Sequence, residues 1–224
     1  MAFMLNNVVP WGRTLNEYRQ MFQLDDECIS KKIADFGGGP ASFNCEANQF
    51  GYSVTSFDPI YQFSKEALEQ RIEEVRVTVM QQMRENMDNY VWTNIKSLEE
   101  LENIRMSAMR LFLTDYQKGL QEKRYIYHEL PEKLPCMDDT FDLGLSSHFL
   151  LMYTSLGFDF HIKAMTEMLR VCKEIRIFPI VDLDANKTEL IKNVIEYFQE
   201  DYKVEIRETA YEFQKGGNKL LVIK

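Results

Sequence analysis

The segment with the clearest chemical potential runs from Asp35 to Ser42 and reads DFGGGPAS. Glycine lets a backbone turn tightly and lets a ligand approach it closely. The short run Ile33 to Phe36 before the glycines predicts a strand, and residues 41–50 after them predict a helix. The free N–H groups at the start of such a helix can bind an anion. This arrangement is typical of a ligand-binding loop between a strand and a helix.

An acidic residue follows at the end of the next predicted strand. The segment Tyr52 to Phe57 is rich in β-branched and aromatic residues, which predicts a strand, and Asp58 comes directly after it. A carboxylate in this position can accept hydrogen bonds from both hydroxyl groups of a ribose. The order strand, loop, helix, strand predicts a βαβ unit with parallel strands. The glycine loop and Asp58 together predict a site for a cofactor that contains a nucleoside.

The spacing within the glycine loop separates two kinds of cofactor. A dinucleotide fingerprint has the pattern G-x-G-x-x-G, and Ser42 occupies its third glycine position here. The loop also has Asp35 two residues before Gly37, which gives the pattern D-x-G-x-G. This pattern resembles the first motif of class I S-adenosylmethionine-dependent methyltransferases. The cofactor of that family carries an ammonium group, which suits a nearby acid.

Other parts of the chain resemble the same family. Residues 134–148, LPCMDDTFDLGLSSH, are similar to its stretch leading into the fourth strand, with Cys136 where Phe is usual. Residues 167–181, EMLRVCKEIRIFPIV, resemble the helix and fifth strand that follow. The segments VVPWGRTLNEYRQMF, FGGGPASFN and LSSHFLLMY resemble a bacterial subgroup of methyltransferases with no assigned substrate. The resemblance implies methyl transfer from S-adenosylmethionine to an unidentified acceptor.

The resemblance also implies a set of cofactor-binding residues at the ends of successive strands: Asp35, Gly37, Gly38, Gly39, Asp58, Pro59, Ile60, Glu129, Leu130, Ser146 and Ser147. Asp35 and the three glycines would form the pocket for the methionyl end of the cofactor. Asp58 would hold the ribose.

The remaining positions of this set would surround the other parts of the cofactor. Pro59 and Ile60 would flank the adenine, and its edge would meet Glu129 and Leu130 in the turn after the third strand. The serine pair that ends the fourth strand would lie beside the sulfonium and the acceptor.

Two residues near the N-terminus are further candidates for the cofactor site. Arg13 and Tyr18 lie in the segment WGRTLNEY, which we expect to fold over the cleft. Arg13 could then form a bidentate contact with the carboxylate of the cofactor. The alternative is a surface helix in which Tyr18 and Phe22 pack inward.

His148 is the candidate general base, because the end of a strand faces the usual cleft of such sheets. A base assists only where the acceptor must lose a proton. The alternative is a structural histidine held by hydrogen bonds. His161 is expected on a helix surface. The segment from Asp58 to Tyr61 resembles the D-P-P-Y motif of amino-group methylases, but it ends the second strand instead of the fourth.

The remaining elements predict the frame that positions these residues. Further strands and helices alternate after residue 124, and the last two strands lack a helix between them. We therefore expect a doubly wound, mostly parallel seven-stranded α/β sheet, a Rossmann-like methyltransferase fold with an antiparallel last strand. The chain is predicted to be one domain over 1–224, with an N-terminal helical segment over 1–30. A helical insertion after strand 2, over 62–123, is expected to cap the acceptor site.

The composition limits the kinds of partner that we expect the protein to bind. Lys and Arg number 26 against 35 Asp and Glu, for a net charge of −9, and no basic run offers a broad nucleic-acid surface. No uninterrupted apolar stretch reaches membrane-spanning length, and the isolated His and Cys residues predict no metal site and no disulfide framework. We expect a cytoplasmic protein with a small-molecule or protein acceptor. The sequence says nothing of its oligomeric state.

Two other functions remain open at this stage. One is a protein that binds S-adenosylmethionine without catalysis, because function lies in the acceptor site and not in the fold. The other is a nicotinamide-dependent oxidoreductase. Ser42 in the third glycine position and the two terminal strands disfavour this function.

Overall fold

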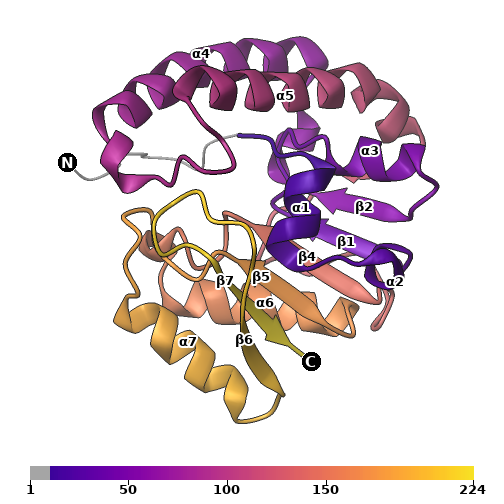
Figure 1. The fold of residues 1–224 in the computed structure, drawn as a ribbon. Helices are drawn as coiled ribbons and strands as arrows, with labels where there is room; N and C mark the ends of the chain where they lie inside the picture. Colours follow the sequence, from indigo (N-terminus) through magenta and orange to yellow (C-terminus); the bar gives the residue numbers. More distant parts are fainter. Residues whose placement is uncertain (1–10) are drawn as a thin grey trace.

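The computed structural model describes residues 11–224, and its centre is a seven-stranded sheet in the order β3-β2-β1-β4-β5-β7-β6 (Figure 1). The strands have these bounds: β1 (Ile33–Phe36), β2 (Val54–Phe57), β3 (Tyr125–Ile126), β4 (Leu143–Ser147), β5 (Ile175–Phe178), β6 (Val204–Glu208) and β7 (Lys219–Ile223). The pairs from β3 to β5 are parallel, and β7 is antiparallel to both β5 and β6. The predicted fold class is therefore confirmed.

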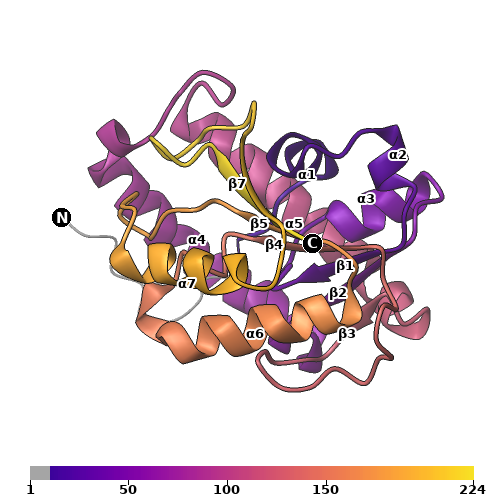
Figure 2. The same cartoon turned by 90° about the horizontal axis from the view of Figure 1, so that it is seen from below.

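Helices cover both faces of the sheet (Figure 2). Their bounds are α1 (Leu15–Phe22), α2 (Asp26–Ile29), α3 (Phe43–Gln49), α4 (Lys65–Glu85), α5 (Leu98–Gln121), α6 (Phe158–Val171) and α7 (Glu189–Gln199), with 3-10 turns η1 (Pro59–Gln62), η2 (Met87–Asn89) and η3 (Thr154–Leu156). α6 and α7 lie on one face, and α1 and α3 lie on the other. None of the helices in residues 11–224 is long and apolar enough to cross a membrane.

The two faces follow from the alternation of side chains along each strand. In β1, Ile33 belongs to the core on the side of α1 and α3, whereas Ala34 and Phe36 belong to the core on the side of α6 and α7. Both cores are buried, which explains why the central strands are apolar on both sides. Because the sheet is packed on both faces, it fixes the positions of the loops that follow its strands.

Local capping signals set the starts of the long helices. Ser64 accepts a hydrogen bond from Ala67 N at the start of α4, and Ser97 accepts one from Glu100 N at the start of α5. Each serine is therefore the N-cap of its helix. The side chain of Glu100 bonds Lys96 N, one residue before the cap.

The helical region 62–123 contains α4 and α5, which lie side by side along the top of the molecule in Figure 1. Val75 and Val79 of α4 pack into the core of the sheet. Leu68 and Ile72 pack instead with Phe112 of α5 in a separate apolar cluster. The region is therefore part of the folded core. Its expected role as a cap on the acceptor site stays a prediction.

His161 lies elsewhere than expected. Its side chain is fully buried in α6, and Nδ1 contacts the carbonyl oxygen of Gly157 at 2.7 Å. The reason is its spacing, because His161 shares a helix face with the core residues Met165 and Met168. The expectation of a surface position was wrong.

Candidate functional site

A cavity of about 350 Å³ lies at the carboxyl ends of the parallel strands. Parallel sheets form ligand sites there, where the loops after neighbouring strands meet. The loops after β1, β2, β3 and β4 all line this cavity, together with the segment that precedes α1.

The cavity brings together most of the residues singled out in the sequence. Its lining includes the following of them: Arg13, Tyr18, Gly37, Gly38, Gly39, Asp58, Pro59, Ile60, Glu129, Leu130, Ser147 and His148. Asp35 and Ser146 do not line it. Both side chains are buried. Within residues 11–224, no group of His, Cys, Asp and Glu side chains could hold a metal ion.

Asp58 fixes the shape of the glycine loop. Its Oδ2 accepts a hydrogen bond from Gly39 N at 2.8 Å, and its Oδ1 accepts one from Ile60 N at 2.9 Å. A carboxylate oxygen can accept more than one hydrogen bond, so both oxygens retain capacity for a ligand. Burial raises the pKa of Asp58 to about 6, against the two backbone hydrogen bonds that lower it.

Asp35 lies beneath the loop, away from the cavity. Its carboxylate is 1% exposed and accepts hydrogen bonds from Tyr18 Oη and Ser56 Oγ, each at 3.0 Å. A Cβ on Gly38 would overlap Asp35 Oδ2, so only glycine fits there. Burial raises the pKa of Asp35 to about 7. The structure thus places Asp35 as a support of the loop, one layer below the position that the resemblance implies.

The segment that carries Arg13 lies on the glycine loop. The carbonyl oxygen of Arg13 accepts a hydrogen bond from Ser42 N at 3.0 Å, and one guanidinium N–H donates to the carbonyl of Trp11. The buried Nε of Arg13 has no partner among the described residues. Burial lowers the pKa of Arg13, and the positive charge of Arg105 adds to this effect. Arg13 is therefore a cation at the cavity wall with capacity for an anion.

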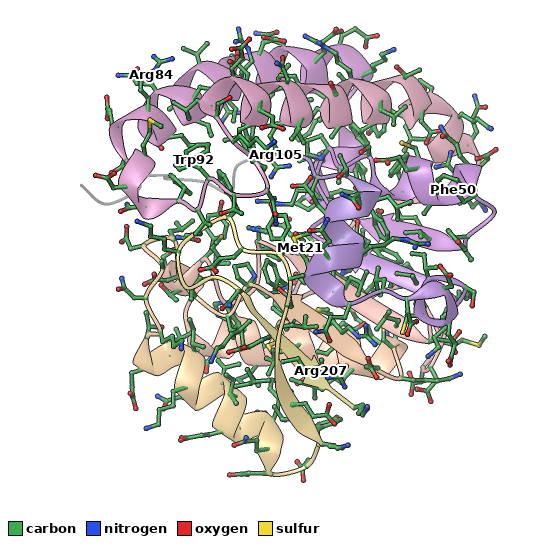
Figure 3. All side chains as sticks on the ribbon, in the orientation of Figure 1. Met21, Phe50, Arg84, Trp92, Arg105 and Arg207 are labelled. Atoms are coloured by element: carbon green, nitrogen blue, oxygen red, sulfur yellow. The ribbon has the colours of Figure 1, made fainter. Side chains whose placement is uncertain are left out.

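A buried ion pair lies behind Arg13, between α1 and α5. Arg105 donates to Glu17 at 2.7 Å, and Tyr211 Oη donates to Glu17 at 2.9 Å. Figure 3 shows Arg105 on the side of α5 that faces the sheet. Burial acts to raise the pKa of Glu17, but the charges of Arg105 and Arg13 outweigh it and lower the pKa. The single carboxylate of Glu17 thus faces two guanidinium groups, those of Arg105 and Arg13. This side of the cavity therefore keeps a net positive charge.

No single motif of the sequence predicts this network. The capping box formed by Thr14 and Glu17 is a local signal that could have located Glu17. Its partners Arg105 and Tyr211 are far away in the sequence and share no motif with it.

His148 has a fixed ring and an uncharged state. Its Nδ1 lies 2.8 Å from Ser147 Oγ, and its ring packs edge-on against Phe178. Burial lowers the pKa of His148 well below its usual value, and the positive charges of Arg13 and Arg105 lower it further. A neutral imidazole at the cavity wall can accept a proton or a hydrogen bond.

Ser146 and Ser147 separate because successive side chains of a strand face opposite ways. Ser147 lines the cavity, but Ser146 is fully buried, and its Oγ has no partner within the described part of the chain. The prediction that Ser146 lies beside the acceptor is therefore wrong, because its side chain is buried and does not line the cavity.

These features define the Rossmann-like fold of class I methyltransferases with a cavity at its usual site. No family model matches the chain. It is 37% identical over 222 residues to an uncharacterized protein of the archaeon Methanocaldococcus jannaschii, covering 98% of this chain and 97% of that protein. The chain belongs to the family of that archaeal protein. The predicted membership of a bacterial subgroup is not shown by this relative.

Solved structures resemble the chain in fold. The methyltransferase domain of bacterial CtHen1 is 11% identical, with a TM-score of 0.50 over 94% of this chain and 99% of that domain. A TehB-like SAM-dependent methyltransferase from Corynebacterium glutamicum is 16% identical, with a TM-score of 0.49 over 98% of this chain and 89% of that one. At such identities the likeness to CtHen1 shows the fold alone.

Proposed function

We propose that the protein is an S-adenosylmethionine-dependent methyltransferase with a small-molecule acceptor. The observation that carries the proposal is the pairing of Asp58 with the glycine loop at the cavity. Asp58 holds Gly39 N and still has acceptor capacity for ribose hydroxyls. The cavity is walled by several elements, which favours a small acceptor over a protein surface.

The residues around the glycine loop fit the methionyl end of this cofactor. A Cβ on Gly39 would meet no atom within 4 Å, so there is open space above the loop. Arg13 supplies a cation for the carboxylate of the cofactor, and its Nε lacks a partner in residues 11–224. Tyr18 lines the same wall and keeps Asp35 in place beneath the loop. Ile60 and Leu130 offer apolar surface to the adenine.

When bound, the cofactor supplies an electrophilic methyl group on a positively charged sulfur. The protein aligns the acceptor with that methyl group and excludes water from it. His148 serves as the general base. In the tautomer whose Nδ1–H donates to Ser147 Oγ, which has Met21 Sδ at 3.9 Å as an acceptor for its own proton, Nε2 keeps its lone pair for the proton of an acceptor.

Isothermal titration of the purified protein tests this function. We expect micromolar binding of S-adenosylmethionine and S-adenosylhomocysteine and no binding of NADH. Binding of NADH alone would contradict the proposal and favour an oxidoreductase. Binding of S-adenosylmethionine without turnover on any acceptor would instead identify a non-catalytic binding protein. Binding of neither ligand would reject the cofactor assignment.

A further inference from the structure

Part of the cavity lies beyond the residues assigned to the cofactor, and it is apolar and aromatic. One wall is formed by Tyr90 and Phe213, whose rings stack with centroids 4.9 Å apart. A second wall is formed by Phe149 and Phe160, which meet edge to face at 6.1 Å. Aromatic walls of this kind favour a flat, apolar ligand.

The first wall is held by main-chain pairing between distant parts of the sequence. Val91 N donates to the carbonyl oxygen of Phe213 at 2.7 Å, and Lys215 N donates to that of Asn89 at 3.0 Å. An isolated β-bridge also joins Tyr90 to Gln214. These hydrogen bonds fix the two aromatic rings by their backbones, so the wall is preformed.

Aliphatic side chains complete this apolar part. Val79 and Met83 come from α4, and Met152 and Leu156 come from the segment after β4. All four line the cavity, and their side chains carry no hydrogen-bond donor. A ligand here gains affinity mainly by burying its own apolar surface.

The charges around the apolar part exclude a cationic ligand. Among described residues, the acids that line the cavity are Asp58 and Glu129, which lie in the loops after β2 and β3, on the side assigned to the cofactor. Apart from tyrosines, the other ionisable groups that line the cavity are Arg13, His128 and His148, and Arg105 adds positive charge from behind. An ammonium group would therefore find repulsion and no carboxylate.

We infer that the acceptor is a flat aromatic molecule with a hydroxyl group that faces His148. This inference rests on the proposed function, whose acceptor class it names. The hydroxyl oxygen forms a bond to the methyl carbon while the bond from that carbon to sulfur breaks. The electron pair of the broken bond stays on sulfur, and the hydroxyl proton passes to Nε2 of His148.

Titration with matched naphthalene probes at pH 7.5 tests the inference. The protein saturated with S-adenosylhomocysteine is titrated with 2-naphthol and, separately, with 2-naphthylmethylamine, which is a cation at this pH. We expect 2-naphthol to bind with a Kd below about 1 mM and at least about tenfold more tightly than the amine. Equal or tighter binding of the amine, or no binding of 2-naphthol, would overturn the inference.

Variants of the aromatic wall test whether 2-naphthol binds in the cavity. Phe213→Leu and Tyr90→Leu should each weaken 2-naphthol binding about fivefold and leave S-adenosylhomocysteine binding within about twofold. Phe63→Leu is the matched control, because Phe63 is 51% exposed and does not line the cavity. If a wall variant does not fold by circular dichroism, Met83→Ala replaces it. Unchanged 2-naphthol binding in the folded variants would show that the probe binds elsewhere.

These titrations distinguish a failure of the proposed function from a failure of the inferred acceptor class. The 2-naphthol titration is repeated without S-adenosylhomocysteine, so the aromatic pocket is tested even if the cofactor does not bind. Loss of cofactor binding alone contradicts the proposed function. Cofactor binding with no preference for 2-naphthol contradicts only the acceptor class.

Discussion

The carboxylate of Asp58 shapes the glycine loop and is also the group assigned to the ribose. Its pKa of about 6 makes binding of the ribose sensitive to pH. At pH 5 only about one-tenth of Asp58 is ionised, so the affinity for S-adenosylhomocysteine should fall about tenfold between pH 7.5 and pH 5. Calorimetry at the two pH values measures this change.

Asp58→Asn should bind more weakly at pH 7.5 and lose most of this pH dependence. Asp201→Asn, at an exposed acid outside the cavity, should keep the wild-type profile. A wild-type affinity that is the same at both pH values would contradict the ribose assignment.

Asp35 should make the unliganded protein less stable as the pH rises. Its pKa in the folded state is about 7, above the ordinary value of 3.8, so the folded state holds more protons between these values. The contribution of Asp35 to stability is complete below about pH 3.8 and is lost as the pH rises through about 7. Between pH 5 and pH 8 the loss should be of the order of 2 kcal/mol.

Urea unfolding of wild type and Asp35→Asn at these two pH values measures the effect. The variant should show a smaller fall in the free energy of unfolding, because its amide does not titrate. The exposed Asp201→Asn again serves as the control. Parallel pH profiles for wild type and Asp35→Asn would show that the carboxyl group of Asp35 does not titrate in this range.

At the scale of elements, the glycine loop tolerates no side chain at its centre. In Gly38→Ala the new methyl group would overlap the carboxylate of Asp35, so the loop or this buried, hydrogen-bonded carboxylate must shift. We expect the affinity for S-adenosylhomocysteine to fall by more than about tenfold. Calorimetry measures the affinity, and circular dichroism checks the fold.

Gly51→Ala is the matched control for this prediction. Gly51 has a φ of +79° and open space around it, and it lies away from the cavity. Alanine there should cost about 1 kcal/mol of stability through backbone strain, with the affinity unchanged. Equal affinity in Gly38→Ala and Gly51→Ala would show that the loop adapts.

The sequence predicted the elements well because their signals are local. Ser64 and Ser97 stand directly before helices with periodic apolar faces, and the strand at Ile33–Phe36 ends at glycines. The predicted surface position of His161 was wrong, although its spacing from Met165 and Met168 places it on the buried face of α6. The depth of Asp35 did not follow, because spacing along the chain does not tell whether a side chain lies above or below a loop.

At the scale of the whole molecule, Glu17 connects α1, α5 and the segment before β7. Glu17→Gln would leave Arg105 and Arg13 buried without a carboxylate, and we expect a loss of about 3–5 kcal/mol in the free energy of unfolding. Arg105→Met should cost less, because Arg13 remains near Glu17. Urea unfolding compares the two variants, and a larger loss in Arg105→Met would contradict this account.

The aromatic part of the cavity could not be predicted from the sequence. Tyr90 and Phe213 belong to no shared motif, and they meet only because residues 89–91 pair with residues 213–215. The residues proposed for the cofactor lie, in contrast, mostly in loops that directly follow strands, and most of them line the cavity, with Asp35 and Ser146 as exceptions. Removing the α4–α5 region would not isolate the aromatic part, since Val75 and Val79 also fill the core of the sheet.

The place of β7 has a consequence for how the chain is made. β7 lies between β5 and β6 in the sheet, although it follows both in the sequence. On a ribosome, a nascent chain that has emerged only as far as β6 therefore leaves the edge of β5 without its neighbour. Phe213 is also absent until shortly before β7 appears. Chaperones that shield exposed strand edges would act on this protein late in translation, and the aromatic part of the cavity would form at the same late stage.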